Sequence, residues 1–189
     1  VEEMGSTLLT IASDVKIQVE FNPAQVAEYR LIGYENRQLA REDFNNDQVD
    51  AGEIGAGHDV TALYELCLVG MGCESSDALR YAAPTPQAAG TGEVACLKRR
   101  YKQPGESRSV LVEQPIRRQD LRSQAGESLR FAAAVAAYAD LLRGGGNMNG
   151  FTWDQVETLA RGARGNDAWG YRGEFLQLLA QARSLSPAR

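Results

Sequence analysis

The stretch "DVKIQVEFNP" (residues 14–23) decides the first half of the fold. Apolar and polar residues alternate along it, Val15, Ile17, Val19 and Phe21 on one side and Lys16, Gln18 and Glu20 on the other. Successive side chains of a strand point to opposite faces, so a period of two predicts a half-buried β-strand. The strand ends at Asn22-Pro23, a pair typical of turns.

Further segments are rich in β-branched and aromatic residues, and turn residues separate them. They are "AEYRLIGYE" (27–35), "HDVTALYELCLV" (58–69), "VACLKRRYK" (94–102) and "SRSVLVEQP" (107–115). The first of them follows the opening strand after a short Asn-Pro turn, which favours a hairpin. Alternating strands with one solvated face predict an antiparallel β unit over residues 13–115. Proline, alanine and glycine dominate residues 71–92, where we expect an exposed excursion.

After Pro115 the period of the apolar residues becomes helical. In "GESLRFAAAVAAYADLLR" (126–143) we expect a buried stripe of Phe131, Val135, Tyr138 and Leu142. In "DAWGYRGEFLQLLAQARSL" (167–185) the expected stripe is Tyr171, Phe175, Leu178 and Ala182, with Asp167 as the candidate N-terminal cap. The sequence therefore predicts an α+β fold: an antiparallel sheet or sandwich of about five strands, then about three helices over 116–189.

The helix in "FTWDQVETLARGA" (151–163) has the best-defined start. Thr152 and Gln155 have the spacing of a capping box, and Phe151 and Val156 that of a hydrophobic staple. Trp153 and Trp169 are interpreted as packing residues rather than as binding aromatics.

The composition, 43% hydrophobic and 24% charged, is that of a globular protein. No apolar run is long enough to predict a transmembrane segment in this chain. The opening "VEEMGSTLL" lacks the basic region of a signal peptide, and Val1 is not an initiator methionine. We therefore expect a processed or truncated chain whose export signal would lie upstream.

Charge is unevenly distributed. Residues 1–60 hold twelve acids and four bases, a net charge of −8, whereas residues 98–130 hold nine bases and four acids, a net charge of +5. We expect these two regions to face each other or solvent. The basic run "LKRRYK" alternates like a strand and has no aromatic stacking platform, so no nucleic-acid partner is predicted.

The three cysteines, Cys67, Cys73 and Cys96, form no C-x-x-C pair. An oxidising compartment would allow one disulfide and one thiol, and the sequence does not choose the pair. In a reducing compartment Cys67 and Cys96 suit strand positions as small buried apolar residues. A zinc site needs four ligands at suitable spacing, which these cysteines and one histidine do not supply.

The acidic loop at residues 42–58 has two interpretations. From Asp43 onward, its residues match the first three ligand positions of an EF-hand calcium loop, and the candidate ligands are Asp43, Asn45, Asp47 and Asp50. The match then fails, because Gln48 replaces the required glycine and Ile54 the final acid, with Glu53 one place early. A solvated loop between strands is the favoured interpretation; a calcium-responsive module using residues 43–53 is the alternative, and the metal ligands stay unassigned.

His58 is the basis of a third interpretation, an enzyme centred on the chain's single histidine. The preceding "GEIGAG" fits neither a dinucleotide-binding fingerprint nor a P-loop, and no nucleophile is indicated beside it. We therefore predict no enzyme, no catalytic residue and no cofactor.

Three stretches resemble a known family: residues 8–66 ("LLTIASDVKIQVEFNPAQ…"), 130–145 ("RFAAAVAAYADLLRGG") and 163–179 ("ARGNDAWGYRGEFLQLL"). They are similar to the region, itself of unknown function, that follows the von Willebrand factor type A domain in a group of bacterial proteins. The resemblance implies that residues 1–12 are the end of the last helix of that domain. Its D-x-S-x-S metal motif does not occur here, so none of its metal ligands transfers.

The resemblance also implies a role. We expect a non-enzymatic accessory or protein-interaction module in a cell-envelope or periplasmic protein. Its partners would be the preceding type A domain and another protein. Extra sequence also precedes the type A domain in this family, so a β-sandwich could be built from both flanks. The strands of this chain would then expose an edge.

Overall fold

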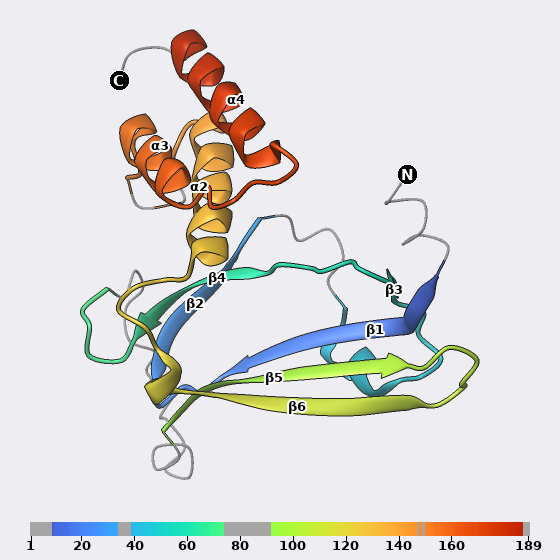
Figure 1. The fold of residues 1–189 in the computed structure, drawn as a ribbon. Coiled ribbons are helices and arrows are strands. Elements are labelled where there is room, and N and C mark those ends of the chain that lie inside the picture. Colours follow the sequence, from blue (N-terminus) through green and yellow to red (C-terminus); the bar gives the residue numbers. More distant parts are fainter. Residues whose placement is uncertain (1–8, 34–38, 74–91, 147, 149, 187–189) are drawn as a thin grey trace. The chain divides into compact units, whose positions relative to one another are not determined.

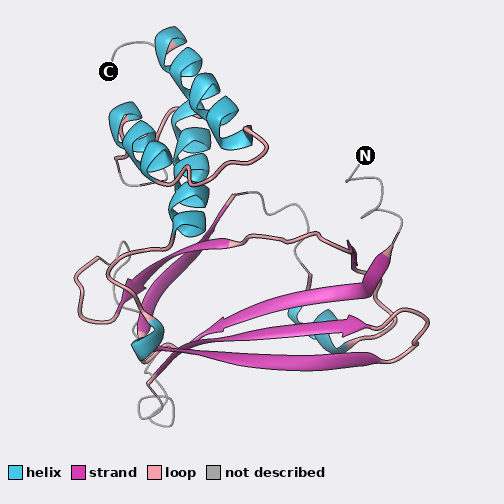
Figure 2. Cartoon of the chain, viewed as in Figure 1, coloured by secondary structure: helices cyan, strands magenta, loops and turns pink. Residues whose placement is uncertain are grey.

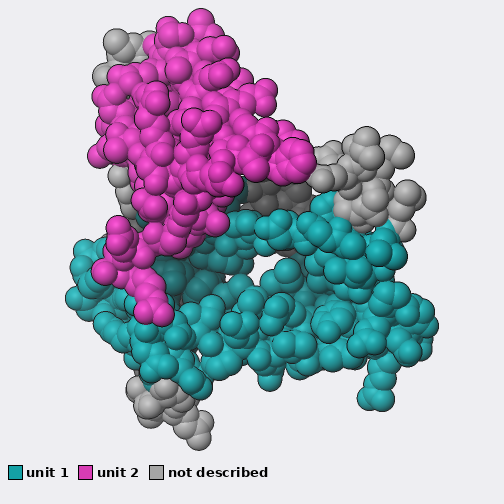
Figure 3. All heavy atoms as spheres, viewed as in Figure 1, with its two compact units in different colours: residues 1–121 teal, residues 122–189 magenta. Residues whose placement is uncertain are grey.

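A computed structural model describes residues 9–33, 39–73, 92–146, 148 and 150–186 of the 189-residue chain. The chain divides into two compact units, residues 1–121 and 122–189 (Figure 3). Antiparallel strands build the first unit and helices the second (Figures 1 and 2), which confirms the predicted α+β class. Among the residues described, no helix is both long and apolar enough to cross a membrane.

The first unit contains a four-stranded antiparallel sheet with the order β3-β1-β5-β6. Its strands are β1 (Thr10–Phe21), β3 (Gly52–Gly55), β5 (Glu93–Lys102) and β6 (Ser109–Arg117). Ile17 lies opposite Arg99, and Arg99 opposite Val112. Directly paired residues share a face, so the register assigns the alternating residues of β1, β5 and β6 to the same two faces.

The remaining strands, β2 (Val26–Ile32) and β4 (Leu63–Leu68), form a separate two-stranded ribbon. The predicted hairpin between the first two strands is therefore wrong. The amides of Gln25 and Val26 both donate to the Asn22 carbonyl, and the Asn22 side chain accepts from the amide of Ala24. This helical turn directs the chain away from the sheet, and β5 takes the place beside β1.

The start of β1 differs from the prediction. Residues 10–12 are strand rather than helix, because Thr10 pairs with Gly55 and Ala12 with Ile54. The partner β3 lies inside the acidic loop, where its two glycines gave no strand pattern. Residues 1–8 of the expected helix, and 74–91 of the expected excursion, lie outside the described residues.

The second unit consists of α2 (Glu127–Leu142), α3 (Trp153–Gly162) and α4 (Tyr171–Leu185). Its core is a fully buried set of small and aliphatic residues, Ala134, Ala137, Val156, Ala160 and Leu179. The alanines let the helices approach closely. The predicted capping box is confirmed: the amide of Gln155 donates to Thr152 Oγ1 (3.3 Å) and that of Thr152 to Gln155 Oε1 (2.8 Å).

Both predicted helix stripes are partly wrong. On α2 the core follows Ala134 and Ala137, so Val135 and Leu142 are exposed instead. On α4 Leu179 is fully buried, whereas Tyr171 and Leu178 are exposed. Apolar residues also lie on both sides of each predicted stripe, so the sequence does not determine which face of the helix is buried. The positions of the neighbouring helices determine it.

Asp167 caps α4 from four residues before the helix. Its carboxylate accepts hydrogen bonds from the amides of Arg172 (2.9 Å) and Gly173 (2.7 Å), while Gly170 occupies the N-cap position with φ 75°. Of the two tryptophans, Trp153 packs edge-on against Tyr138, as expected. Trp169 is 70% exposed, so its packing assignment is wrong.

Candidate interaction surface

The acidic loop packs on one face of the four-stranded sheet. It forms the short 3-10 helix η1 (Arg41–Asn45), whose Phe44 is 5% exposed. The guanidinium carbon of Arg100 lies 5.7 Å from the centre of the Phe44 ring. The loop is therefore anchored on the sheet through Phe44, while Glu42, Asn45 and Asn46 are exposed, as the prediction of a solvated loop between strands expects.

Cationic side chains of β1 and β5 hold the loop in place. The Lys16 ammonium donates to the backbone carbonyls of Asp43 and Asn46 and is only 4% exposed. Arg100 donates to Asn45 Oδ1 (3.0 Å), and Lys102 donates to the Asp47 carbonyl (2.9 Å). We call Lys16, Arg100 and Lys102 the loop cations.

Two carboxylates complete this arrangement. Asp47 accepts from the amide and hydroxyl of Ser109, and these hydrogen bonds lower the pKa of its carboxyl group. Asp14 lies in an irregularity of β1, with φ 50°, and accepts from the amide of Ala51. Its ion pair with Lys102 lowers the pKa of Asp14 and raises that of Lys102. The predicted facing of the acidic and basic regions is confirmed at these contacts.

These contacts weigh against the calcium interpretation. A calcium ion needs six to eight oxygen ligands, and the oxygens that the loop turns toward the sheet already accept hydrogen bonds from the loop cations. Asp43 contributes its backbone carbonyl there, not its carboxylate. Within the part of the chain that the structure describes, no three His, Cys, Asp or Glu side chains are grouped to hold a metal.

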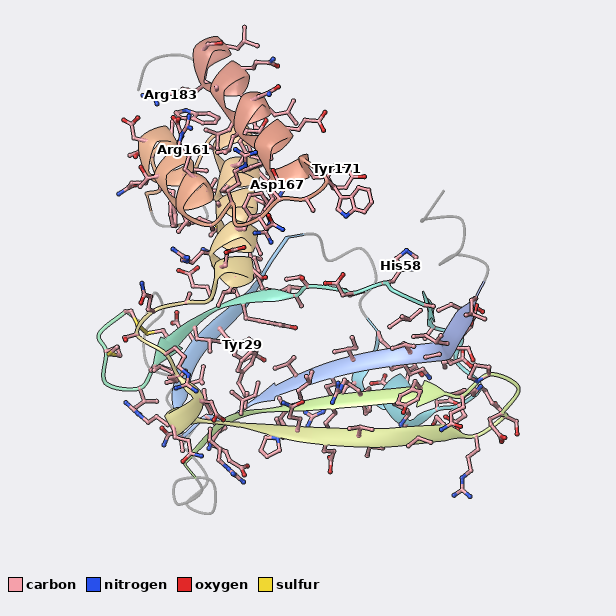
Figure 4. The ribbon with its side chains drawn as sticks, in the orientation of Figure 1. Tyr29, His58, Arg161, Asp167, Tyr171 and Arg183 are labelled. Carbon is pink, nitrogen blue, oxygen red and sulfur yellow. A yellow bond between two sulfur atoms is a disulfide. The ribbon has the colours of Figure 1, made fainter. Side chains whose placement is uncertain are left out.

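His58 lies in the turn after β3, with an exposed side chain (Figure 4). Its backbone amide donates to the carbonyl of Gly55. The structure groups the acidic-loop residues with the loop cations rather than with His58, so the enzyme interpretation gains no support from the described geometry.

The opposite face of the sheet is apolar and incompletely covered. The register groups on it Ile17 of β1, Arg99 and Tyr101 of β5, and Val110 and Val112 of β6, which we call the open face. Ile17, in the interior of its strand, is 53% exposed, and Val110 is 43% exposed. Arg99 is also exposed and donates to Gln114 on the same face. A half-exposed aliphatic side chain on an inner strand, such as Ile17 of β1, is typical of a surface that another element covers.

The ribbon covers one end of this face. The ring centroid of Phe21 lies 4.3 Å from that of Tyr29 and 5.3 Å from that of Tyr64. Tyr29 extends from β2 toward the sheet (Figure 4), yet it is 60% exposed. In Figure 3 the background is visible through the first unit, in the region that lies between β1 and the β3–β4 connection in Figure 1. The sequence predicted the apolar side of β1 but not that part of it is uncovered.

The cysteine pairing is resolved by the fold. Cys67, in β4, forms a disulfide with Cys73 across a turn that contains Gly70 and Gly72, both with positive φ. Cys96 is a free thiol on β5.

The second unit presents a shallow apolar depression on α3, lined by Gly150, Phe151, Asp154, Gln155, Thr158 and Leu159. Arg183 of α4 pairs with Asp154 and Glu157, and Arg161 also pairs with Glu157 (Figure 4). The two ion pairs of Arg183 connect α3 and α4 at the surface, whereas the Arg161–Glu157 pair lies within α3, so their role is structural.

This chain is similar to one family of known proteins. The family described as "Uncharacterized protein YfbK, C-terminal" matches residues 6–185. The uncharacterized protein YfbK of Escherichia coli strain K12 is 50% identical over 182 residues, which are 95% of this chain and 31% of that protein. No solved structure matches the chain.

Proposed function

We propose, from the premise that this chain belongs to the family of the C-terminal region of the uncharacterized protein YfbK, that it is a non-enzymatic accessory module that binds protein. The module acts beside a von Willebrand factor type A domain in a bacterial cell-envelope protein. The chain spans 31% of the length of its curated relative, which leaves room for such a domain.

The open face carries this proposal. Lys16 is buried on β1 while Ile17, the next residue, is half-exposed. Apolar area that stays in water at the centre of a sheet loses about 25 cal/mol of stabilisation per Å². A protein surface laid on Ile17, Val110 and Val112 recovers that energy. The half-exposed Tyr29, which contacts Phe21 at the covered end of the face, is of a residue type enriched at interfaces.

The disulfide supports the location. Disulfides persist in oxidising compartments such as the periplasm and are rare in the cytosol. The Cys67–Cys73 pair thus favours an exported protein. Peptide mapping of the protein isolated from cells is expected to find Cys67 joined to Cys73 and Cys96 reactive, and three free thiols would contradict the proposed location.

The function is tested with the open face altered. The chain and its Ile17→Glu variant are used as baits for envelope proteins, with Leu178→Glu as the matched control. Leu178, on α4 of the second unit, is 50% exposed, close to the 53% of Ile17, so it changes surface hydrophobicity by a similar amount on another unit. We expect a partner to be retained by the parent and by Leu178→Glu and lost with Ile17→Glu. Equal retention by all three baits would remove the open face as the binding surface.

A further inference from the structure

We infer that the ribbon of β2 and β4 is a partial second sheet of a β-sandwich, and that a strand of the same polypeptide, outside these 189 residues, completes it over the open face. This inference rests on the proposed function, because it names the partner that the open face binds.

The ribbon is the first reason. Among the described strands, β2 and β4 pair only with each other. A two-stranded ribbon is marginal alone. The described contacts that join this one to the sheet lie at one end, where Tyr29 and Tyr64 meet Phe21 and Arg118 donates to the Gln25 side chain. The outer edges of β2 and β4 pair with no other strand among the described residues, and these edges and the uncovered part of the sheet fit one incomplete sandwich.

The geometry of sandwiches is the second reason. Two antiparallel sheets pack face to face at about 10 Å and cover each other when their widths match. Here the four-stranded sheet is wider than the two-stranded ribbon, and Ile17 and Val110 are residues of the wider sheet that remain exposed. One added strand pairs its backbone with a ribbon edge and turns alternate side chains onto the open face. Its apolar side chains meet Ile17 and Val112, and an acidic or amide side chain suits Arg99.

The source of the strand follows from chain length. The curated relative contains more than twice as much sequence outside the matched region as inside it, since 31% of it is covered. A segment in the same polypeptide is held at a high effective concentration, so it competes successfully against a free partner of equal intrinsic affinity.

The test compares one engineered thiol in two contexts. Ile17→Cys is placed in a Cys96→Ala background, in the 189-residue chain and in the full-length gene product, and the rate of maleimide labelling is measured under native conditions. We expect labelling to be roughly tenfold or more slower in the full-length product, because the thiol there reacts only on local opening. Leu178→Cys, on α4 of the second unit, is expected to react equally fast in both. Val110→Cys serves as a second site if the first variant fails to melt like the parent.

The other outcomes separate the inference from the proposed function. Fast labelling in both contexts overturns the inference. If a second copy of the chain, added at rising concentration, or a partner from the envelope then protects Ile17→Cys, the inference still fails and the proposed function stands. If nothing protects the thiol, both fail.

Discussion

Lys16 and Ile17 are neighbours on β1, yet the lysine is 4% exposed and the isoleucine 53% exposed. This reverses the usual preference, since lysine is almost never fully buried unless its charge has partners. Lys16 has two carbonyl partners in and beside η1, whereas Ile17 lies on the open face. At this point of the strand the polar side is covered and the apolar side is not. The predictions below follow from this inversion and from the packing of the second unit.

The first prediction concerns the buried lysine. Lys16→Met removes the charged donor to the carbonyls of Asp43 and Asn46, which keep their backbone donors, the amides of Asn46 and Val49. A hydrogen bond from a charged group contributes about 1.5–3 kcal/mol, so we expect a loss of this order in the free energy of urea unfolding. The control is Lys98→Met, whose exposed ion pair with Glu20 is worth less than about 1 kcal/mol. Equal losses in the two variants would show that burial of Lys16 has no special role.

The second prediction concerns calcium. Because the loop cations already donate to the loop oxygens, we expect millimolar calcium to leave the melting temperature of the chain unchanged. Differential scanning fluorimetry with and without calcium measures this. A rise in melting temperature that Asp47→Asn abolishes would restore the calcium-responsive interpretation.

The third prediction concerns acid. The pKa values of Asp14 and Asp47 are lowered in the folded chain, so their ionised forms stabilise it. This stabilisation is complete above the unfolded pKa, about 3.9, and is lost as the pH falls through the lower folded pKa values. We expect unfolding free energy to fall below about pH 4 and to fall less steeply in Asp14→Asn, which has less to lose. Parallel pH profiles of parent and variant would contradict the assignment.

The fourth prediction separates two adjacent leucines of α4. Leu179 is fully buried against α2 and α3, and Leu178 is 50% exposed. We expect Leu179→Ala to cost about 2–5 kcal/mol of unfolding free energy and Leu178→Ala less than about 1 kcal/mol. Thermal and urea unfolding of the isolated residues 122–189 measure both, and they also test whether this compact unit folds alone. A larger loss for Leu178→Ala than for Leu179→Ala would contradict this assignment and support the buried stripe predicted from the sequence.

Local features were predictable from the sequence. The alternation on β1, the switch to a helical period after Pro115 and the capping box at Thr152 depend on residues close together in the chain. The pairing of β2 with β4 could not be predicted from local sequence. It depends on β5, more than 70 residues away in the chain, pairing with β1 in place of β2. The short strand β3, with its two glycines, has no pattern that separates it from a turn.

The candidate surface was only half predictable. The opposite charges of residues 1–60 and 98–130 anticipated the contacts of Asp14 and Asp47 with β5 and β6. No local signal marks Lys16 as buried, because its acceptors lie 27 and 30 residues away. The exposure of Ile17 also depends on what the ribbon leaves uncovered.

The most direct test of the open face is the effect of Ile17→Asp on stability in two contexts. Thermal and urea unfolding are measured for the 189-residue chain and for the full-length gene product. In the short chain the half-exposed site is expected to change unfolding free energy by no more than about 1 kcal/mol. In the full-length product the same aspartate would be covered without a partner, and we expect a loss of at least about 2 kcal/mol. An equal change in both would contradict the claim that the open face is covered by the polypeptide that carries it.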